Sequence, residues 1–377
     1  MKKNQRNEIS IRTKTEFLAQ LEQADSLKNC TISPMDLTGI SWPWESICLE
    51  NVTFLGCEFE AEVQQKLNLG GAVLYIKQPH LPYHPFRASL YTWQELESKH
   101  PDDKKTVDEV IYHHFSSSKY NPHLNEALNQ RIHDHAMDDA LREVLQFDET
   151  GMTQKKCVGI MGGHSTLRTD PFFRTTALTA QLLAKNGYYV VSGGGPGIME
   201  AANLGAYFGT YEQGELEDAL KILAQKADYR MEGYQDQARE VLSKYPHGAD
   251  NLAIPTWFYG HEPSNYFAKN IAKYFSNSLR EDILLAICLY GVVFAPGSAG
   301  TTQEIFQDAA QNHYGTFGFY SPMVFLGKER FSRQTMLYPL LQQLAAGRIY
   351  QEFLHLTDQP EEVLSFLLNH PPRRVEN

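Results

Sequence analysis

The second half of the chain contains three places where a short apolar run passes directly into a turn rich in small residues and then into a helical pattern. The apolar runs are Cys157–Met161, Tyr188–Ser192 and Gly291–Ala295, and the turns that follow them begin at Gly162, Gly193 and Pro296. Apolar runs of this length, bounded by glycine and proline, are typical of buried strands. Strands that alternate with helices form parallel sheets with helices on both faces. The sequence therefore predicts an α/β fold with a doubly wound, Rossmann-like parallel sheet.

The helical patterns complete this expectation. They predict helices at about residues 173–186, 198–207, 264–275 and 303–312, and the next apolar run predicts a strand at Met323–Leu326. Ligands of doubly wound sheets bind beyond the carboxyl ends of the strands. We therefore expect all three turns to lie at the edge of the sheet that binds a ligand.

The first 150 residues differ in character from the rest, with irregular proline-containing stretches and few strands that end at glycine. The chain has 377 residues, which exceeds the roughly 100–200 residues of a usual single domain. The change falls at Asp148–Gly151. The sequence therefore predicts a smaller, mixed accessory domain at residues 1–150 and the α/β domain at residues 151–377.

Two patterns organise the expected accessory domain. Leu49, Phe54 and Phe59 follow one another at a five-residue step, which resembles a pentapeptide-repeat coil. So few turns cannot form a free-standing solenoid, so we expect a short β-like patch that leans on a larger body. Apolar positions three and four residues apart predict a long amphipathic helix at residues 124–147, which would connect the two domains.

Composition excludes several functional classes. The chain carries 34 Lys and Arg against 45 Asp and Glu, a net charge of −11, which would repel nucleic acid. No apolar stretch reaches the ~18–20 residues of a membrane-spanning helix. The five cysteines are scattered along the chain without the spacing of metal-ligand pairs, and no apolar signal core follows the N-terminus. We expect a reduced cytoplasmic protein without nucleic-acid or membrane partners.

The turns themselves suit an anion. Glycine lets a phosphate approach the main chain, and a helix N-terminus directs N–H groups at it. Gly193–Gly197 lacks the lysine of a P-loop and the spacing of the dinucleotide fingerprint. We therefore expect a single phosphate rather than a pyrophosphate. The alternative is that these glycines only permit tight turns between strand and helix.

The three turns together resemble a known family. The blocks are Gly162-Gly163-His164-Ser165, the segment Gly193-Gly194-Gly195-Pro196-Gly197-Ile198-Met199-Glu200-Ala201-Ala202, and the segment Pro296-Gly297-Ser298-Ala299-Gly300-Thr301-Thr302-Gln303-Glu304. They resemble the ordered motifs of the LOG-type family, formerly labelled lysine decarboxylase-like. The chain is most similar in layout to the longer bacterial pyrimidine/purine nucleotide 5′-monophosphate nucleosidases. The resemblance covers about residues 155–327.

This resemblance implies a hydrolase that converts a nucleoside 5′-monophosphate to free base and ribose 5-phosphate. It implies catalysis by Glu304, substrate positioning by Arg280, and a phosphate held by the loop and helix start at residues 300–302. It implies no metal or other cofactor, and a homodimer or higher homo-oligomer. The residues that it assigns to substrate and phosphate are Gly163, His164, Ser165, Gly194, Gly195, Gly197, Met199, Glu200, Gly297, Ser298, Gly300, Thr301 and Thr302.

Two departures from the family pattern leave an alternative function open. Ser298 stands where the family has a glycine, and Arg280 lies one position further from Pro296 than expected, a rotation of ~100° on a helix. The alternative is a nucleotide-sensing protein that binds without turnover, with a regulatory N-terminal domain. Glu304 would then be an acid that favours a helix N-terminus, and Arg280 would pair with Glu281 or Asp282. Decarboxylation with pyridoxal phosphate is disfavoured because no lysine follows these strands.

Several other residues have weaker claims to a functional role. Ser165 also suits a helix cap, and Glu262, Asn277 and Asn312 are further candidates for the site. The aromatic residues Tyr266, Phe267, Tyr274 and Phe275 suit the core, and one of them could stack on a base.

A histidine-rich helix raises a metal hypothesis. His133, His135, Asp138 and Asp139 share this predicted helix. Zinc needs three or four converging ligands, which one helix does not supply, so these residues predict a solvated polar face rather than a metal site.

Overall fold

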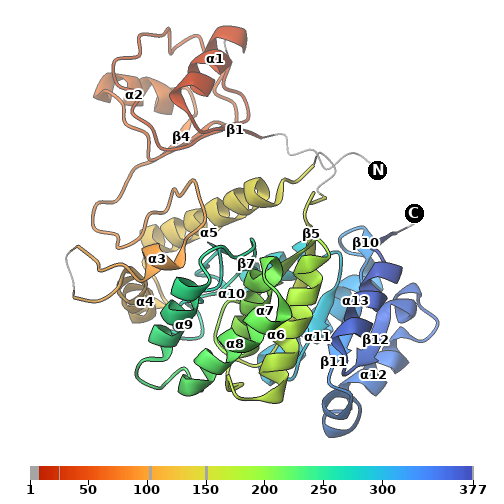
Figure 1. Ribbon diagram of the computed structural model, residues 1–377. Coiled ribbons are helices and arrows are strands. Elements are labelled where there is room, and N and C mark those ends of the chain that lie inside the picture. Colours follow the sequence, from red (N-terminus) through yellow and green to blue (C-terminus); the bar gives the residue numbers. More distant parts are fainter. Residues whose placement is uncertain (1–7, 25, 102–103, 149–151, 376–377) are drawn as a thin grey trace. The chain divides into compact units, whose positions relative to one another are not determined.

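The computed structural model describes residues 8–24, 26–101, 104–148 and 152–375 (Figure 1). The chain divides into two compact units, one of Met1–Ser89 with His123–Met152 and one of Leu90–Pro122 with Thr153–Asn377. The expected domain change near residue 150 falls on residues 149–151, outside the described residues, and next to the last unit boundary. Residues 90–122, which we expected in the accessory domain, group with the α/β unit instead.

The α/β unit is built on a seven-stranded parallel sheet, which confirms the predicted fold class. Its strand order is β12-β11-β9-β5-β6-β7-β8, and all six pairings are parallel. The strands are β5 (Lys156–Met161), β6 (Tyr188–Ser192), β7 (Leu252–Ala253), β8 (Asn270–Ile271), β9 (Val292–Phe294), β11 (Met323–Leu326) and β12 (Leu354–Thr357). From β5 the chain extends the sheet in both directions, so β5 and β9 flank its topological switch point.

Helices cover this sheet, and two further short strands pair with each other. The helices of the unit are α3 (Trp93–Leu96), α4 (Val107–Ser118), α6 (Pro171–Lys185), α7 (Ile198–Tyr207), α8 (Gln213–Leu223), α9 (Tyr234–Lys244), α10 (Asn277–Ile287), α11 (Ala299–Tyr314), α12 (Leu337–Ala345) and α13 (Pro360–Asn369). A π-helical segment, η3 (Arg330–Gln334), follows β11, and 3-10 turns occur at Phe208–Thr210, Ala224–Lys226 and Ile349–Phe353. Strands β10 (Phe319–Tyr320) and β13 (Arg373–Arg374) pair antiparallel.

Successive side chains of a strand point to opposite faces of the sheet, and helices cover both faces. Val158 and Ile160 of β5 belong to a buried cluster that also contains residues of α6, α7 and α13. The intervening Gly159 faces the opposite layer, where an added Cβ would lie 3.0 Å from Sγ of Cys288, just after α10. Because both faces are buried, these strands have almost no polar positions, as expected for a central parallel sheet.

Local capping fixes where the helices of the site begin. Asp170 caps α6, with its side chain accepting from the Phe172 amide at 2.7 Å, so Ser165 is not the cap that it resembled. Helix α11 begins at Ala299, four residues before the expected start. Residues 300–302 therefore lie in the first turn of a helix and not in the loop before it.

One predicted helix is absent. Residues 264–275 contain strand β8 and run alongside β7 and the residues after it, with the Ala272 amide donating to Ala253 and the Tyr274 amide donating to Pro255. The apolar spacing of this segment fits either a helix or a buried strand. Pairing with the exposed edge of β7 decides for the extended form, because it satisfies backbone groups on both segments.

The other unit contains a parallel four-stranded sheet in the order β1-β2-β3-β4. Ile9 pairs with Cys30, Thr31 with Thr53, and Thr53 with Val73, so successive strands are 20 to 22 residues apart. The elements are β1 (Ile9–Ile11), α1 (Lys14–Ala24), β2 (Cys30–Ile32), β3 (Thr53–Leu55), α2 (Ala61–Leu69), β4 (Val73–Tyr75) and the long α5 (Leu124–Leu145). The predicted long helix is confirmed.

The β-like patch is larger than the five-residue pattern predicted. A hydrophobic core of its own joins Phe17 and Leu21 of α1, Phe54 of β3 and Leu67 of α2. Leu49 and Phe54 are buried in it and Phe59 packs against it. The five-residue step therefore marks real core positions of a coil whose full turn is about four times longer. Across the described part of both units, no helix combines the length and apolarity needed to cross a membrane.

Candidate functional site

The three small-residue turns meet at one edge of the α/β unit. Strands β9, β5 and β6 are neighbours and parallel, so the turns that leave their carboxyl ends are adjacent. The Gly163 amide donates to the Pro296 carbonyl at 3.0 Å, and the Ile198 amide donates to the Gly163 carbonyl at 3.1 Å. The turns are therefore hydrogen-bonded into one structure.

Glycine is required where these turns touch. Gly197 has φ +68°, and a Cβ there would lie 2.4 Å from the Gly163 carbonyl oxygen. A Cβ on Gly297 would lie 2.1 Å from Oγ1 of Thr301 in the same segment and 3.0 Å from the Gly163 amide nitrogen in the neighbouring turn. Contacts under 3 Å leave no room for a side chain, so these glycines first serve the contact between turns.

The turn after β6 is covered by protein side chains. A Cβ on Gly193 would meet Nη2 of Arg280 at 2.6 Å, and one on Gly195 would meet Oε2 of Glu262 at 2.5 Å. Met199 also lies against both glycines. Gly193–Gly197 are buried. The missing side chains therefore make room for a guanidinium and a carboxylate of the chain itself.

Arg280 and Glu304 form a buried ion pair at this edge. Arg280 on α10 is 7% exposed and Glu304 on α11 is 8% exposed. Nη1 of Arg280 lies 3.4 Å from Oε1 of Glu304, while Nε donates to the Ile254 carbonyl at 2.8 Å and Nη2 to the Gly193 carbonyl at 3.3 Å. The one-residue offset in register does not separate the two residues. Arg280 thus links the ends of β6 and β7 to α11.

Burial gives Glu304 an unusual protonation equilibrium. Removal from water raises the pKa of Glu304 to about 7, because Arg280 only partly offsets the burial and Glu281 adds to the rise. A carboxyl group with a pKa near neutrality exchanges protons readily at physiological pH, as general acids and bases do. The alternative predicted that Arg280 pairs with Glu281 or Asp282, whereas the carboxylate that it pairs with in the structure is that of Glu304.

A second acid lies one helical turn further into the protein. Burial raises the pKa of Asp308 to about 8. Its Oδ1 accepts from Nδ2 of Asn312 at 3.4 Å, while its Oδ2 has no hydrogen-bond partner among the described residues. Asn312 accepts from the Ser321 amide at 2.7 Å. Asn312, weakly predicted for the site, is therefore part of the buried interior.

Further polar residues surround Glu304, and of these the sequence had proposed Asn277 as a site candidate. Asn277 donates to Oε1 of Glu281 at 2.7 Å and to the Tyr259 hydroxyl at 2.9 Å, and Gln303 donates to Oε2 of Glu281 at 2.6 Å. The ring of Tyr259 is exposed. No motif marks Glu281 or Tyr259, since their neighbourhood depends on how α10 packs beside α11.

A hollow of about 410 Å³ opens where α11 begins. Gly300 has open space around it, and Thr302 donates through Oγ1 to the Ser298 carbonyl at 3.0 Å. Thr301 is buried against Gly297. The residues that line the hollow are Gly163, Ser165, Thr166, Phe172, Pro296, Gly297, Ser298, Glu329, Arg330 and Gln334. Sequence reasoning missed Arg330, which lies outside every motif.

Two of the predicted site residues have partners elsewhere in the protein. Glu200 is buried, its carboxylate bound by the guanidinium of Arg168 and the hydroxyl of Tyr234. His164 is exposed, with its ring 6.4 Å from that of Tyr229. The four aromatic residues weighed for base stacking, Tyr266, Phe267, Tyr274 and Phe275, are buried core residues.

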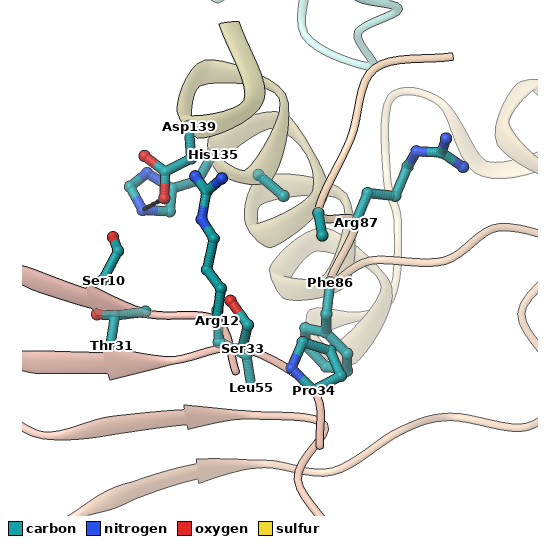
Figure 2. A pocket seen from close by; sticks show the side chains of 12 residues that line it. Ser10, Arg12, Thr31, Ser33, Pro34, Leu55, Phe86, Arg87, His135 and Asp139 are labelled. Atoms are coloured by element: carbon teal, nitrogen blue, oxygen red, sulfur yellow. Dashed lines mark ion pairs between the residues drawn. The ribbon is translucent and has the colours of Figure 1, made fainter. Parts of the chain in front are cut away.

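The described residues include no group of three or more His, Cys, Asp and Glu side chains placed to hold a metal ion. His133 is buried, whereas His135 faces outward and lies 3.7 Å from Asp139. Figure 2 shows that His135 and Asp139 line a pocket in the other unit together with Arg12 and Arg87. Its volume is about 20 Å³, room for about one water, and Arg12 is paired with Glu143.

One segment of this unit matches a known family model. Residues 155–211, which span β5, α6, β6 and α7, match the SLOG cluster4 family (LDcluster4). This match supports a family of the LOG/SLOG type. No curated protein matches the chain.

Several solved structures are similar to the chain at low identity. A molybdenum cofactor binding protein from the phototrophic bacterium Rippkaea orientalis is 15% identical, with a TM-score of 0.36, over 57% of this chain and 97% of that chain. The molybdenum cofactor carrier protein MCP from Chlamydomonas reinhardtii is 15% identical, with a TM-score of 0.36, over 58% of this chain and 100% of that chain. Likenesses of this size say nothing about what this chain binds.

Proposed function

We propose that this LOG/SLOG-type chain is a hydrolase that cleaves the N-glycosidic bond of nucleoside 5′-monophosphates, giving free base and ribose 5-phosphate. One observation carries the proposal: Glu304 is a buried carboxyl group with a pKa of about 7, placed at the ligand-binding edge and paired with Arg280. It stands one and a half turns into α11, whose first turn adjoins an open hollow.

In the proposed reaction the bond between C1′ and the base nitrogen breaks, and its electron pair leaves with the base. Positive charge develops on the ribose, as in other oxocarbenium-like transition states. The Glu304 carboxylate stabilises this charge and accepts a proton from the water whose oxygen bonds to C1′. The proton that Glu304 received then passes to the base, so the carboxylate is regenerated and the overall reaction consumes one water.

Arg280 supports Glu304 in this proposal rather than binding the leaving group. Two of its nitrogens donate to backbone carbonyls and a third faces Glu304. A guanidinium fixed in this way holds the carboxylate in place and favours its charged form. Phosphate binding at a distance from C1′ would supply the energy that positions the bond for cleavage.

A lysine-dependent reaction with pyridoxal phosphate has less support. Lys273 lies near the turn after β6, but both oxygens of the Asp108 carboxylate accept from its Nζ, at 2.7 and 2.9 Å. The amine of Lys273 is therefore engaged by a carboxylate of the protein rather than directed at a cofactor.

The non-catalytic alternative is favoured by one observation, that the donors of Arg280 already bind the protein. A base-release assay on the purified full chain with AMP, GMP, CMP and UMP separates the two functions. Release of free base with ribose 5-phosphate from at least one of them supports the hydrolase. Binding of a nucleotide without release from any of the four would select the sensing protein.

The proposal includes the homodimer or larger homo-oligomer that the family resemblance implies, with subunits paired through helices beside the site. Light scattering coupled to size exclusion measures the mass of the purified chain in solution. A mass of 42.9 kDa, that of a single chain, would contradict this part of the proposal.

A further inference from the structure

Arg330 lies at the hollow beside the start of α11, although no motif contains it. It is the first residue of η3, after β11, and it is partly buried. Its Nη2 donates to the Gly297 carbonyl at 2.7 Å. A guanidinium carries five N–H donors, so this bond fixes the side chain against the turn and leaves most of its donors for another acceptor.

Other donors line the same hollow. The hydroxyls of Ser165 and Ser298 are exposed there. Ser298 is the N-cap residue of α11, yet its side chain makes no capping hydrogen bond to the first turn. The first N–H groups of a helix have no partner within the helix and carry partial positive charge. A cation, two hydroxyls and the positive end of a sixteen-residue helix therefore surround one space.

The hollow also contains one acid, and its position limits its effect. Glu329 lines the hollow, but its side chain is 62% exposed and its Oε2 lies 3.5 Å from Nη1 of Arg333. Water and this neighbouring guanidinium screen its charge. The field inside the hollow is therefore set mainly by Arg330 and the helix.

The structure assigns Arg330 as the residue that binds the phosphoryl group of the substrate, in the hollow formed by Gly297, Ser298 and Ser165. The planar fork of arginine matches the geometry of a phosphate monoester. The turn at Gly193–Gly197 is buried under Arg280 and Glu262, so it offers a phosphate less access. The inference rests on the proposed function for the identity of the phosphate ester.

Glu304 does not itself line the hollow, so the ribose would lie between the hollow and Glu304. Glu304 follows Ser298 by six residues on one helix, which is ~9 Å along the axis. A phosphoryl group at the helix start and C1′ near Glu304 would thus lie at the two ends of one sugar phosphate. Arg330 holds one end while Glu304 acts on the other.

The test compares the effects of replacing Arg330 and Arg333, which lie one and four residues after Glu329. Arg330→Gln removes the charge in the hollow, and Arg333→Gln is the matched control, because Arg333 is 80% exposed. Isothermal titration with ribose 5-phosphate and with inorganic phosphate measures affinity in the full chain. We expect Arg330→Gln to lower the affinity for ribose 5-phosphate by about tenfold or more, as for loss of a hydrogen bond to a charged group. Arg333→Gln should stay within about twofold.

Equal affinity in Arg330→Gln and the wild type would overturn the inference. If Arg330→Gln fails to fold, Gln334→Glu tests the same space, because Gln334 is exposed at the rim and makes no bond to Gly297 that the structure shows. The added negative charge should weaken ribose 5-phosphate by about tenfold, and unchanged affinity would again reject the site.

The base-release assay keeps this inference apart from the proposed function. If the wild type releases no base and Arg330→Gln loses the binding of ribose 5-phosphate, the phosphate site is retained and the hydrolase is rejected. Base release with an unchanged KM in Arg330→Gln would retain the hydrolase and reject the role of Arg330.

Discussion

The protonation of Glu304 sets the pH dependence that the proposed reaction should show. Burial raises the pKa of Glu304 from 4.5 to about 7, and the reaction uses the charged form. The value of kcat/KM for the monophosphate that the chain cleaves should therefore rise about tenfold per pH unit below pH 7 and level off above it. A profile measured from about pH 5 to pH 9 checks this; activity that is flat across that range would contradict a carboxylate with this pKa.

Asp308 should make the stability of the protein fall as pH rises, whereas the proposed activity rises with pH. Burial raises the pKa of Asp308 from 3.8 to about 8, so the folded state holds the proton more tightly than the unfolded chain does. The stability from this proton is complete below about pH 4 and is lost as pH rises to about 8, at about 1.4 kcal/mol per pH unit. Asn at position 308 has no proton to lose.

We therefore expect Asp308→Asn to gain stability relative to the wild type as pH rises from about 4 to 9. Urea unfolding at a series of pH values measures this difference. If the difference between the two proteins stays constant with pH, Asp308 does not titrate as its burial requires.

At the scale of single residues, the sequence proposed Glu304 from a motif and, through the family resemblance, Arg280 from its spacing to that motif. Glu304 and Arg280 were expected at the site, and the structure places them together. Arg330, Glu281 and Tyr259 were not expected, because each reaches the site through the packing of elements far apart in sequence. Glu200 could not be distinguished from a ligand-binding acid, since Arg168 and Tyr234, its partners, carry no local signal.

At the scale of the elements, the contact between turns predicts a strong requirement for Gly197. It combines φ +68° with 2.4 Å between an added Cβ and the Gly163 carbonyl oxygen. Gly197→Ala should lower the free energy of unfolding by roughly 2 kcal/mol or more. Gly214→Ala is the control, because Gly214 lies in α8 with open space around it, and alanine there should raise stability by up to about 1 kcal/mol. Equal effects in urea unfolding would contradict the packing of these turns.

The elements that were predicted best are those with an unambiguous pattern. Tyr188–Ser192, Met323–Leu326 and the helix at 198–207 have the predicted bounds, because continuous apolar runs and glycine boundaries define them. The segment at 264–275 was predicted wrongly, since its apolar spacing fits two structures and only pairing with β7 decides between them. Local pattern does not contain that information.

At the scale of the whole molecule, residues 90–122 are tied to the α/β unit by a buried charge. Asp108 of α4 accepts from Nζ of Lys273 at 2.7 Å and from Nε1 of Trp257 at 2.8 Å, and lies 3.3 Å from Nε2 of His261. Although burial opposes it, Lys273 and His261 hold the pKa of Asp108 down at about 2. His261 precedes Glu262, which covers the turn after β6.

Asp108→Asn should therefore destabilise the α/β unit by about 3–5 kcal/mol, because it leaves Lys273 buried without a counter-charge. Asp228→Asn is the control, a partly exposed acid of the same unit that pairs with the exposed Arg230, and it should change stability little. Thermal unfolding of the full chain compares the two. Similar midpoints would contradict the assignment of residues 90–122 to this unit.

The sequence could not predict that assignment. Residues 90–122 precede the long helix α5 and lack the strand pattern of the α/β unit, so proximity in the chain grouped them with the first unit. Their place depends on partners such as Lys273 and Trp257, more than a hundred residues later. Charge, by contrast, is a property of the whole chain, and the net −11 required no structure to argue against nucleic acid.

The most direct measurement compares the wild-type chain with Glu304→Gln, following ribose 5-phosphate formed from AMP, GMP, CMP and UMP in turn and, by titration, the affinity for ribose 5-phosphate. Turnover by the wild type should be lost in Glu304→Gln, by about a hundredfold or more, while both proteins bind ribose 5-phosphate with similar affinity. Turnover at the wild-type rate in Glu304→Gln would remove this carboxylate from the chemistry and contradict the account.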